Sequence, residues 1–467
     1  MNAEAKRLGW SGLILLLGLH LGGGDGWGQT PISLDEVVTR ALEQGPRVED
    51  ARLGVEAARA RVREARSQLF PQLDATFGYT RNLTTPSAFL PAVLFDPDAG
   101  PEELVRVAFG ADNVWSTAIT FRQALFDGRA FAGLGAASAF ADLAGEEMRG
   151  ERHDVVTGVR VRYYDLLLAE EEERLAEGAL ERVRETLDEA RRLYEAGLAS
   201  EYDVLRLEVE VATLEPSLSR ARNARREAAR DLSVTMGGDE GAELTAMGSL
   251  SEIDLADREE NSAENRALLD FSGTGEGAGR TELRQLDMQR ELVRSELRAE
   301  RADYLPRIFL VGGYEVQAQQ DGDIRLFGES GFRGYGRTVG LQVSLPLFTG
   351  LGRSARVERV RTELRRVEIR RELVAARTDA EEATAGERLE EAAAMAAAQR
   401  RAIEQAERGY RIIVGEYEAG LAGRLEVMDA ELSLRRAEVR YAEAVHGWLV
   451  ERARLDRLLG TVPGGER

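Results

Sequence analysis

The chain has 467 residues, enough for two or three domains, and its formal net charge of −20 argues against nucleic acid, whose phosphates require a basic surface. The absence of cysteine excludes disulfides, thiolate metal sites, a cysteine nucleophile and a lipid anchor on an N-terminal cysteine. Long stretches rich in Ala, Glu, Arg and Leu are typical of long helices and coiled coils.

The segment 1–28 has the features of a secretory signal peptide. Lys6 and Arg7 give a positive start, and the apolar segment 12–22 is too short to span a membrane. We therefore expect the segment 1–28 to be removed on export. No other segment carries about 20 consecutive apolar residues, so entry into a membrane would require a closed β-barrel.

The rest of the chain repeats one unit. The matching segments are FPQLDATFGYT (70–80) with LPRIFLVGGYE (305–315), RQALFDGRA (122–130) with SLPLFTGLG (344–352), YEAGLA at 194 with YEAGLA at 417, and DLSVTMG (231–237) with RLDRLLG (454–460). Three of these matches share nearly the same offset in residue number, which is 223 for the YEAGLA pair. The offset of the first match is larger, because copy one has a longer loop at 83–112. The pattern predicts a tandem duplication of about two hundred residues.

Each copy is expected to contain two strands, and all four alternate apolar with small or polar residues. The expected strands are at about 70–82, 113–126, 305–318 and 336–348. A strand of about ten such residues fits the wall of a membrane barrel, with its apolar side chains outside and its polar ones within. A soluble, half-buried sheet shows the same alternation.

A long helical hairpin follows the strands in each copy, at about 129–236 and 351–460. Residues 129–196 and 351–418 would form helices about 100 Å long. Gly197 and Gly420 are expected to end them, since glycine adopts positive φ at a helix C-terminus. The apolar seam before the first tip, and its counterpart before the second, repeat at heptad spacing: Leu180, Val183, Leu187, Ala190 and Tyr194; Ile403, Ala406, Tyr410, Ile413 and Tyr417.

The expected organisation is a first repeat (29–237), a linker or equatorial region (238–280), a second repeat (281–462) and a short tail (463–467). We expect the linker to form loops and a short helix packed as a collar around the helices. His153 and His446 have no spaced partner that would indicate zinc, and we expect neither a cofactor nor enzymatic activity.

The duplicated plan, SQLFPQLDATFGYT (67–80), LPLFTG (345–350) and the paired Tyr-x-x-Gly-Leu tips resemble the TolC family of outer-membrane efflux channels over about 31–462. The resemblance implies a mixed, mostly α fold and a homotrimer. Each subunit would give four strands to a twelve-stranded outer-membrane β-barrel, which continues as a periplasmic α-helical barrel.

The resemblance also implies a function. The trimer would be the passive exit duct of a tripartite efflux or type I secretion system, surrounded by outer-membrane lipid. It would receive substrate from an inner-membrane pump and a periplasmic adaptor (membrane fusion) protein.

In this family an acidic ring beyond the second tip narrows the periplasmic entrance, and LEVMDA (425–430) matches it. Glu426 and Asp429 occupy the two acidic positions and share a helix face. Three copies would place six carboxylates around one axis, which favours opening or binding of a cation. The alternative is an ordinary solvated acidic face.

The family also ties its two hairpins together near the tips, and Asp203 and Tyr417 match two of the residues involved. The family's arginine position falls on Ala422, whereas Arg424 follows shortly after it and could reach a carboxylate. Tyr417 is also explained as a seam residue.

Four tip residues match the positions at which the family docks its adaptor: Gly197, Leu198, Gly420 and Leu421. A plain helix C-cap explains them equally well.

The competing hypothesis is an exported coiled-coil scaffold or adhesin without a channel. The four strands argue against it, because a scaffold has no use for them.

Overall fold

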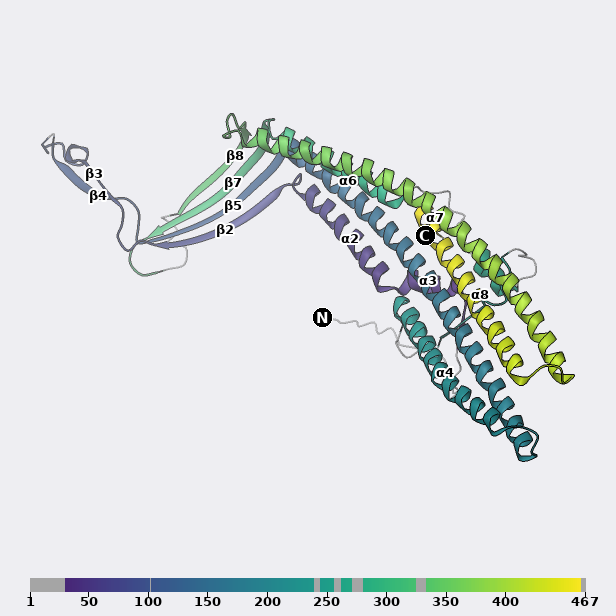
Figure 1. Ribbon diagram of the computed structural model, residues 1–467. Coiled ribbons are helices and arrows are strands. Elements are labelled where there is room, and N and C mark those ends of the chain that lie inside the picture. The colour runs from purple at the N-terminus through teal and green to yellow at the C-terminus, as the bar shows by residue number, and fades with distance from the viewer. Residues whose placement is uncertain are drawn as a thin grey trace, which may run out of the picture.

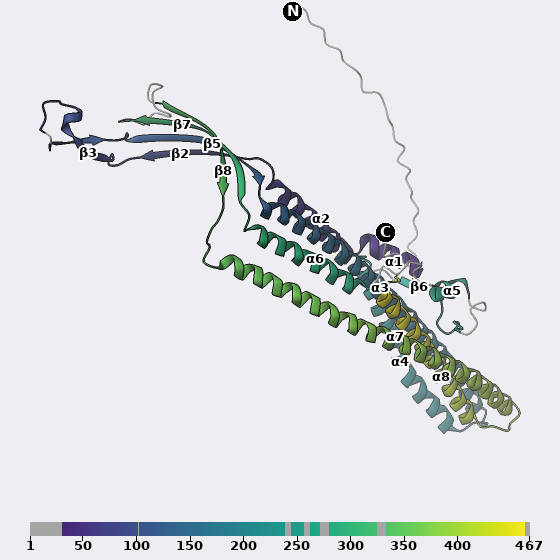
Figure 2. The ribbon, with the colours of Figure 1, turned by 90° about the horizontal axis from the view of Figure 1, so that it is seen from above.

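The computed structural model describes residues 30–100, 102–238, 244–255, 262–270, 280–324 and 333–462. The expected signal peptide (1–28) and tail (463–467) lie outside the described residues. The molecule is elongated, with the main strands towards one end and the two helical tips at the other (Figures 1 and 2).

Both copies share the order helix, strand, strand, long helix and return helix, and the first copy has additional short elements. The first contains β1 (Thr30–Ile32), α1 (Leu34–Gln44), α2 (Pro46–Ser67), β2 (Gln72–Arg81), β3 (Ser87–Pro91), the short 3-10 helix η1 (Ala92–Leu94), β4 (Leu104–Ala108), β5 (Asn113–Phe126), α3 (Gly128–Glu195) and α4 (Glu201–Thr235). The linker and second copy contain β6 (Leu244–Ala246), α5 (Ala263–Asp270), α6 (Thr281–Ala302), β7 (Arg307–Gln320), β8 (Arg333–Ser344), α7 (Gly352–Glu418) and α8 (Arg424–Leu459). The chain is therefore mostly helical, as expected.

Four strands form one antiparallel sheet in the order β2-β5-β7-β8, and they overlap the four segments expected to be strands. Cross-strand pairing places like side chains on one face. The apolar face includes Leu73, Phe77, Ile119, Leu310, Tyr314, Leu341 and Val343; the opposite face includes Asp74, Thr76, Ser116, Thr120, Thr338, Gln342 and Ser344. Much of the apolar face is exposed on this chain: Val339, for example, is 81% accessible.

The long loop of the first copy contains structure that the sequence analysis missed. β3 and β4 pair in a separate two-stranded antiparallel sheet beyond the end of the main one (Figure 1). The strands are short, and η1 lies in the segment between them. The twelve residues 92–103 join these strands in place of a two-residue turn, which explains why the segment read as a loop.

The helices pack in a row in the order α4, α3, α8, α7. α3 has 68 residues and α7 has 67, both continuous as expected. The first heptad seam is buried at Leu180, Val183, Leu187 and Ala190, against Leu207 and Leu214 of α4. Tyr194, at the end of that seam, is 45% exposed because the hairpin ends there. None of the described helices is both long and apolar enough to cross a membrane.

In the region where a collar was expected, elements distant in sequence pack against α3 and α4. β1 pairs in parallel with β6, which follows the first hairpin. The buried hydroxyl of Tyr163 on α3 lies 2.9 Å from the carbonyl oxygen of Ile32 and 2.8 Å from that of Met247, one on each side of this pairing. The described part of the linker is thereby attached to α3.

Candidate functional site at the helical tips

Both long helices end in the same hydrogen-bonded turn. Gly197 and Gly420 have φ of 72° and 75°, a region that glycine enters without steric cost. The amide of Leu198 donates to the Leu193 carbonyl and that of Leu421 to the Glu416 carbonyl, both at 2.8 Å. The bonds from C″ to C3 define a Schellman motif in each copy.

The leucines that follow these glycines do not pack against their own helices. Leu198 is 76% exposed and Leu421 is 81% exposed. A Schellman motif is often completed by a hydrophobic contact of this residue with its helix, but these two leucine side chains remain largely exposed. Each tip presents one apolar knob at the end of the molecule.

The return helices are capped differently. In the first tip, Ser200 and Asp203 form a capping box: the Ser200 hydroxyl oxygen accepts from the Asp203 amide, and the Asp203 carboxylate accepts from the Ser200 amide at 3.4 Å. The Ser200 hydroxyl also donates to this carboxylate, at 2.7 Å. In the second, Gly423 has no side chain, and only Glu426 bonds back, accepting from the Gly423 amide at 2.8 Å.

Both expected acidic residues lie on α8, just beyond the second tip. Glu426 and Asp429 are both exposed at the start of α8. Glu426 is the counterpart of Asp203 in the first repeat, so both serve as helix caps. Asp429 is the counterpart of Arg206, so the carboxylate pair is a feature of the second tip alone.

Asp203 and Tyr417 are not brought together within one chain. Asp203 lies on α4 and Tyr417 on α7, the two outermost helices of the row, with α3 and α8 between them (Figure 1). A contact between these residues would require a second copy of the chain.

Arg424 does tie the hairpins together. Its guanidinium donates to the Thr186 carbonyl at 3.2 Å and contacts the Glu189 carboxylate at 3.3 Å, both on α3. The contacts join the start of the second return helix to the first long helix. The sequence suggested a carboxylate partner, but not which one.

A series of ion pairs continues this contact along the seam between α3 and α8. From the tip towards the collar the ion pairs are Glu189–Arg424, Arg182–Glu431, Arg160–Asp456 and Asp154–Arg457. A hydrogen bond between Asp165 and His446 lies among them. The sequence analysis missed this series, since no local spacing connects residues that lie in different repeats. Arg160 is the most buried member, 1% exposed, and lies 2.8 Å from Asp456.

One carboxyl group in the collar is strongly perturbed. Burial raises the pKa of Glu170 on α3 to about 7, although a hydrogen bond from the Ala246 amide at 3.1 Å and the charge of Arg225 act in the opposite direction. The Ala246 amide on β6 therefore donates its hydrogen bond to a titratable group, the Glu170 carboxyl.

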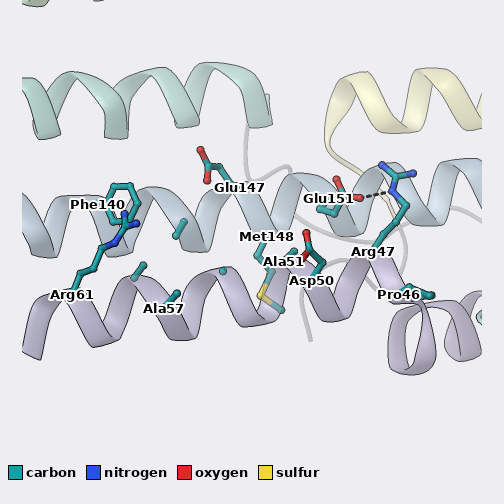
Figure 3. Close-up of a pocket in the computed structure, with 13 residues that line it drawn as sticks. Pro46, Arg47, Asp50, Ala51, Ala57, Arg61, Phe140, Glu147, Met148 and Glu151 are labelled. Carbon is teal, nitrogen blue, oxygen red and sulfur yellow. Dashed lines mark ion pairs between the residues drawn. The ribbon is translucent and has the colours of Figure 1, made fainter.

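A groove of about 710 Å³ lies between α2 and α3 (Figure 3). Arg61 stacks over the ring of Phe140 at 4.8 Å, and Arg47 pairs with Glu151 at 2.6 Å. Its described lining contains no histidine, serine or tyrosine, and its carboxyl groups are Asp50, Glu147 and Glu151. Within the described ranges, no cluster of three or more His, Asp or Glu is suited to holding a metal ion.

The fold and the paired tips match a known family. The family model described as outer membrane efflux protein matches residues 37–238 and 277–461, one segment for each copy of the repeat. The chain belongs to this family. The resemblance to the TolC family is thereby confirmed.

A curated relative of this outer membrane efflux protein is the alkaline protease secretion protein AprF of Pseudomonas aeruginosa. The two are 25% identical over 311 residues, which are 66% of this chain and 60% of AprF. The match thus spans less than two thirds of the relative's length.

Solved outer-membrane channels share the fold. The Campylobacter jejuni channel CmeC has a TM-score of 0.72 at 15% identity, covering 93% of this chain and 87% of that one. VceC of Vibrio cholerae has a TM-score of 0.67 at 17% identity, covering 92% and 96%. The open state of Neisseria gonorrhoeae MtrE has a TM-score of 0.68 at 19% identity, covering 92% and 89%. CmeC and MtrE are outer membrane channels, and VceC is an outer membrane protein.

Proposed function

We propose that this protein is one third of a passive exit duct. Three copies would form a twelve-stranded barrel in the outer membrane, continued by an α-helical barrel in the periplasm. An inner-membrane pump and a periplasmic adaptor would load the duct with substrate, in an efflux or a type I secretion system.

The four-stranded sheet is the observation that carries the proposal. In the described chain, its outer strands β2 and β8 each pair on one side only. Its apolar face is exposed and its other face is polar. An open sheet leaves backbone groups unsatisfied in lipid, so these edges must meet other strands, and a lipid-facing apolar surface explains the exposed side chains.

The tips would perform two tasks in the assembled duct. Glu426 and Asp429, repeated in three copies, would form the acidic constriction of the periplasmic entrance. The exposed Leu198 and Leu421 beside Gly197 and Gly420 would dock the adaptor. Asp203 and Tyr417, on outer helices of neighbouring copies, would tie the hairpins of those copies, while Arg424 holds α8 to α3 within each copy.

Single-channel conductance in planar bilayers tests the proposal. The purified full-length protein should conduct with a preference for cations. We expect Glu426→Gln with Asp429→Asn to lose that preference, because the carboxylates at the entrance are removed. Glutamine can still accept the Gly423 amide, so the cap of α8 is retained.

Glu195→Gln, an exposed carboxylate at the end of α3, is the matched control and should leave selectivity unchanged. A folded protein without conductance would overturn the duct. Conductance with unchanged selectivity in the double variant would keep the duct and remove the acidic constriction.

A further inference from the structure

The two halves of the sheet have identical register. In the first copy Gln72 of β2 pairs with Arg122 of β5, and in the second Arg307 of β7 pairs with Ser344 of β8. Gln72 and Arg307 are therefore equivalent positions, and so are Arg122 and Ser344. When equivalent positions are matched along the strands, each pair between β2 and β5 corresponds to a pair between β7 and β8.

The contact between the two halves is made by β5 and β7. Ile119 pairs with Tyr314, and Arg122 pairs with Val311. It joins the second strand of one repeat to the first strand of the next. In a closed ring of repeats, the next contact of this kind would join β8 of one copy to β2 of its neighbour, because β8 is again a second strand and β2 a first strand.

We infer that β8 pairs with β2 of a second copy of this chain in the register that β5 and β7 already use. The inference rests on the proposed function, and it deepens that proposal by naming the pairs. Replacing each residue of the β5–β7 contact by its equivalent places Leu341 opposite Tyr79, Val343 opposite Phe77 and Ser344 opposite Thr76.

The side chains agree with this register. Leu341 and Val343 would lie beside Tyr79 and Phe77, all four on the apolar face and all exposed in the single chain. Ser344 would lie beside Thr76 on the polar face. A shift by one residue would oppose the apolar face of one edge to the polar face of the other, so the register is restricted to steps of two.

The end of the strand agrees as well. The pairing between β5 and β7 is irregular between Ala124 and Phe126, which leaves Leu125 as a bulge. The equivalent residues after β8 are Pro346 and Leu347. Proline lacks an amide hydrogen and is found at bulges and edges, so β8 can extend through Leu345 opposite Ala75 and bulge where β5 does.

Disulfide cross-linking tests the register, because the chain has no native cysteine. Thr76→Cys/Ser344→Cys should cross-link between copies when full-length protein in outer membranes is oxidised. Directly opposed Cα atoms lie about 4.5–5.5 Å apart, within the range for a disulfide. Boiled, non-reduced samples should show covalent dimers and trimers.

Two pairs on the same polar face serve as controls, each displaced by one step of two along the strand: Asp74→Cys/Ser344→Cys and Thr80→Cys/Gln342→Cys. Their separations are about 7–8 Å, and we expect at least a roughly tenfold lower yield. The single variants Thr76→Cys and Ser344→Cys should give no cross-link and confirm folding by conductance.

The outcomes separate the register from the duct. Preferential cross-linking of Thr76→Cys/Ser344→Cys supports the register. Preferential cross-linking of either displaced pair overturns the register and leaves the trimeric duct standing. A trimer by mass in which none of the three pairs cross-links overturns pairing of these edges. A monomer overturns both proposals.

Discussion

The two long helices are nearly equal in length and occupy equivalent places in the repeat, yet their burial differs. α3 buries many more side chains than α7 does. α3 packs against α2, α4, α6 and α8, whereas the main partners of α7 are α6 and α8. By the repeat, the contacts of α3 with α6 and α8 correspond to contacts of α7 with α2 and α4 of a neighbouring copy, which such a copy would supply.

The exposed side chains of α4 support this comparison. Leu205 is 52% exposed, while its counterpart Met428 on α8 packs against the apolar seam of α3 and α4. Tyr202 and Val209 are also exposed. α4 therefore carries an apolar surface equivalent to the one that α8 uses on α3, and in the proposed assembly this surface would pack on α7 of a neighbouring copy.

The seam within a chain also differs from this expected seam between chains. By the repeat, the pair Arg182–Glu431 corresponds to Gln405 with Glu208. The pair Glu189–Arg424 corresponds in the same way to Ile412 with Glu201. Neither counterpart is a pair of opposite charges. Contact between copies near the tip would therefore depend more on apolar packing than does contact between the hairpins of one chain.

The largest effect is expected where the internal seam is most buried. Arg160→Ala leaves the Asp456 carboxylate buried without its partner, which should cost about 3–5 kcal/mol. Arg160→Met with Asp456→Leu should recover most of the loss. Chemical unfolding followed by circular dichroism measures both.

Arg366→Ala, which breaks an exposed pair with Glu363 on α7, is the control and should change stability by less than about 1 kcal/mol. Equal losses for Arg160→Ala and Arg366→Ala would contradict the importance of the buried seam.

Leu205→Asp should weaken association between copies. If Leu205 occupies the centre of the contact with α7 of a neighbour, its loss should weaken binding by about 2 kcal/mol, or roughly thirtyfold. Mass photometry at decreasing concentration in detergent measures the change. Leu94→Asp, an exposed leucine in the loop between β3 and β4, should not affect association; a variant Leu205→Asp that associates like wild type would argue against the α4–α7 contact.

Glu170 should make stability depend on pH. The folded pKa of about 7 exceeds the ordinary value of 4.5, so the folded chain binds a proton more tightly and stability falls as pH rises from about 4.5 to 7. Glu170→Gln should be about 1–2 kcal/mol more stable than wild type at pH 8, with the gain absent at about pH 4.5. Thermal unfolding at the two pH values measures this gain, and exposed Glu185→Gln should show none.

The smallest effects concern the two caps. Ser200→Ala removes the side chain that caps α4 and should destabilise the first tip by about 1 kcal/mol. Gly423→Ser supplies the missing cap in the second and should stabilise it by a few tenths of a kcal/mol. Hydrogen exchange of the amides at each tip would reveal both, and changes of the same sign would contradict the difference between the caps.

The periodic features of this fold could be predicted from the sequence because they are local. Alternation along β2 separates the apolar from the polar face of the sheet, and heptads along α3 mark the buried face of that helix. Gly197 and Gly420 mark turns that require positive φ. The capping box of Ser200 and Asp203 was missed, although its members stand at the i and i+3 spacing of that motif.

Other features depend on distant contacts and could not be predicted in this way. The ion pairs between α3 and α8, the pairing of β1 with β6 and the perturbed carboxyl of Glu170 arise only when the two repeats pack together. For the candidate site, the sequence analysis placed Glu426 on a helix just beyond the second tip, but its role in capping that helix required the geometry.

Native mass spectrometry of the detergent-purified protein tests the central claim most directly, namely that the exposed helix α7 and the sheet edges β2 and β8 are completed by further copies. The account predicts one species with three times the mass of the mature chain. A stable monomer or dimer that retains the helical content would contradict it.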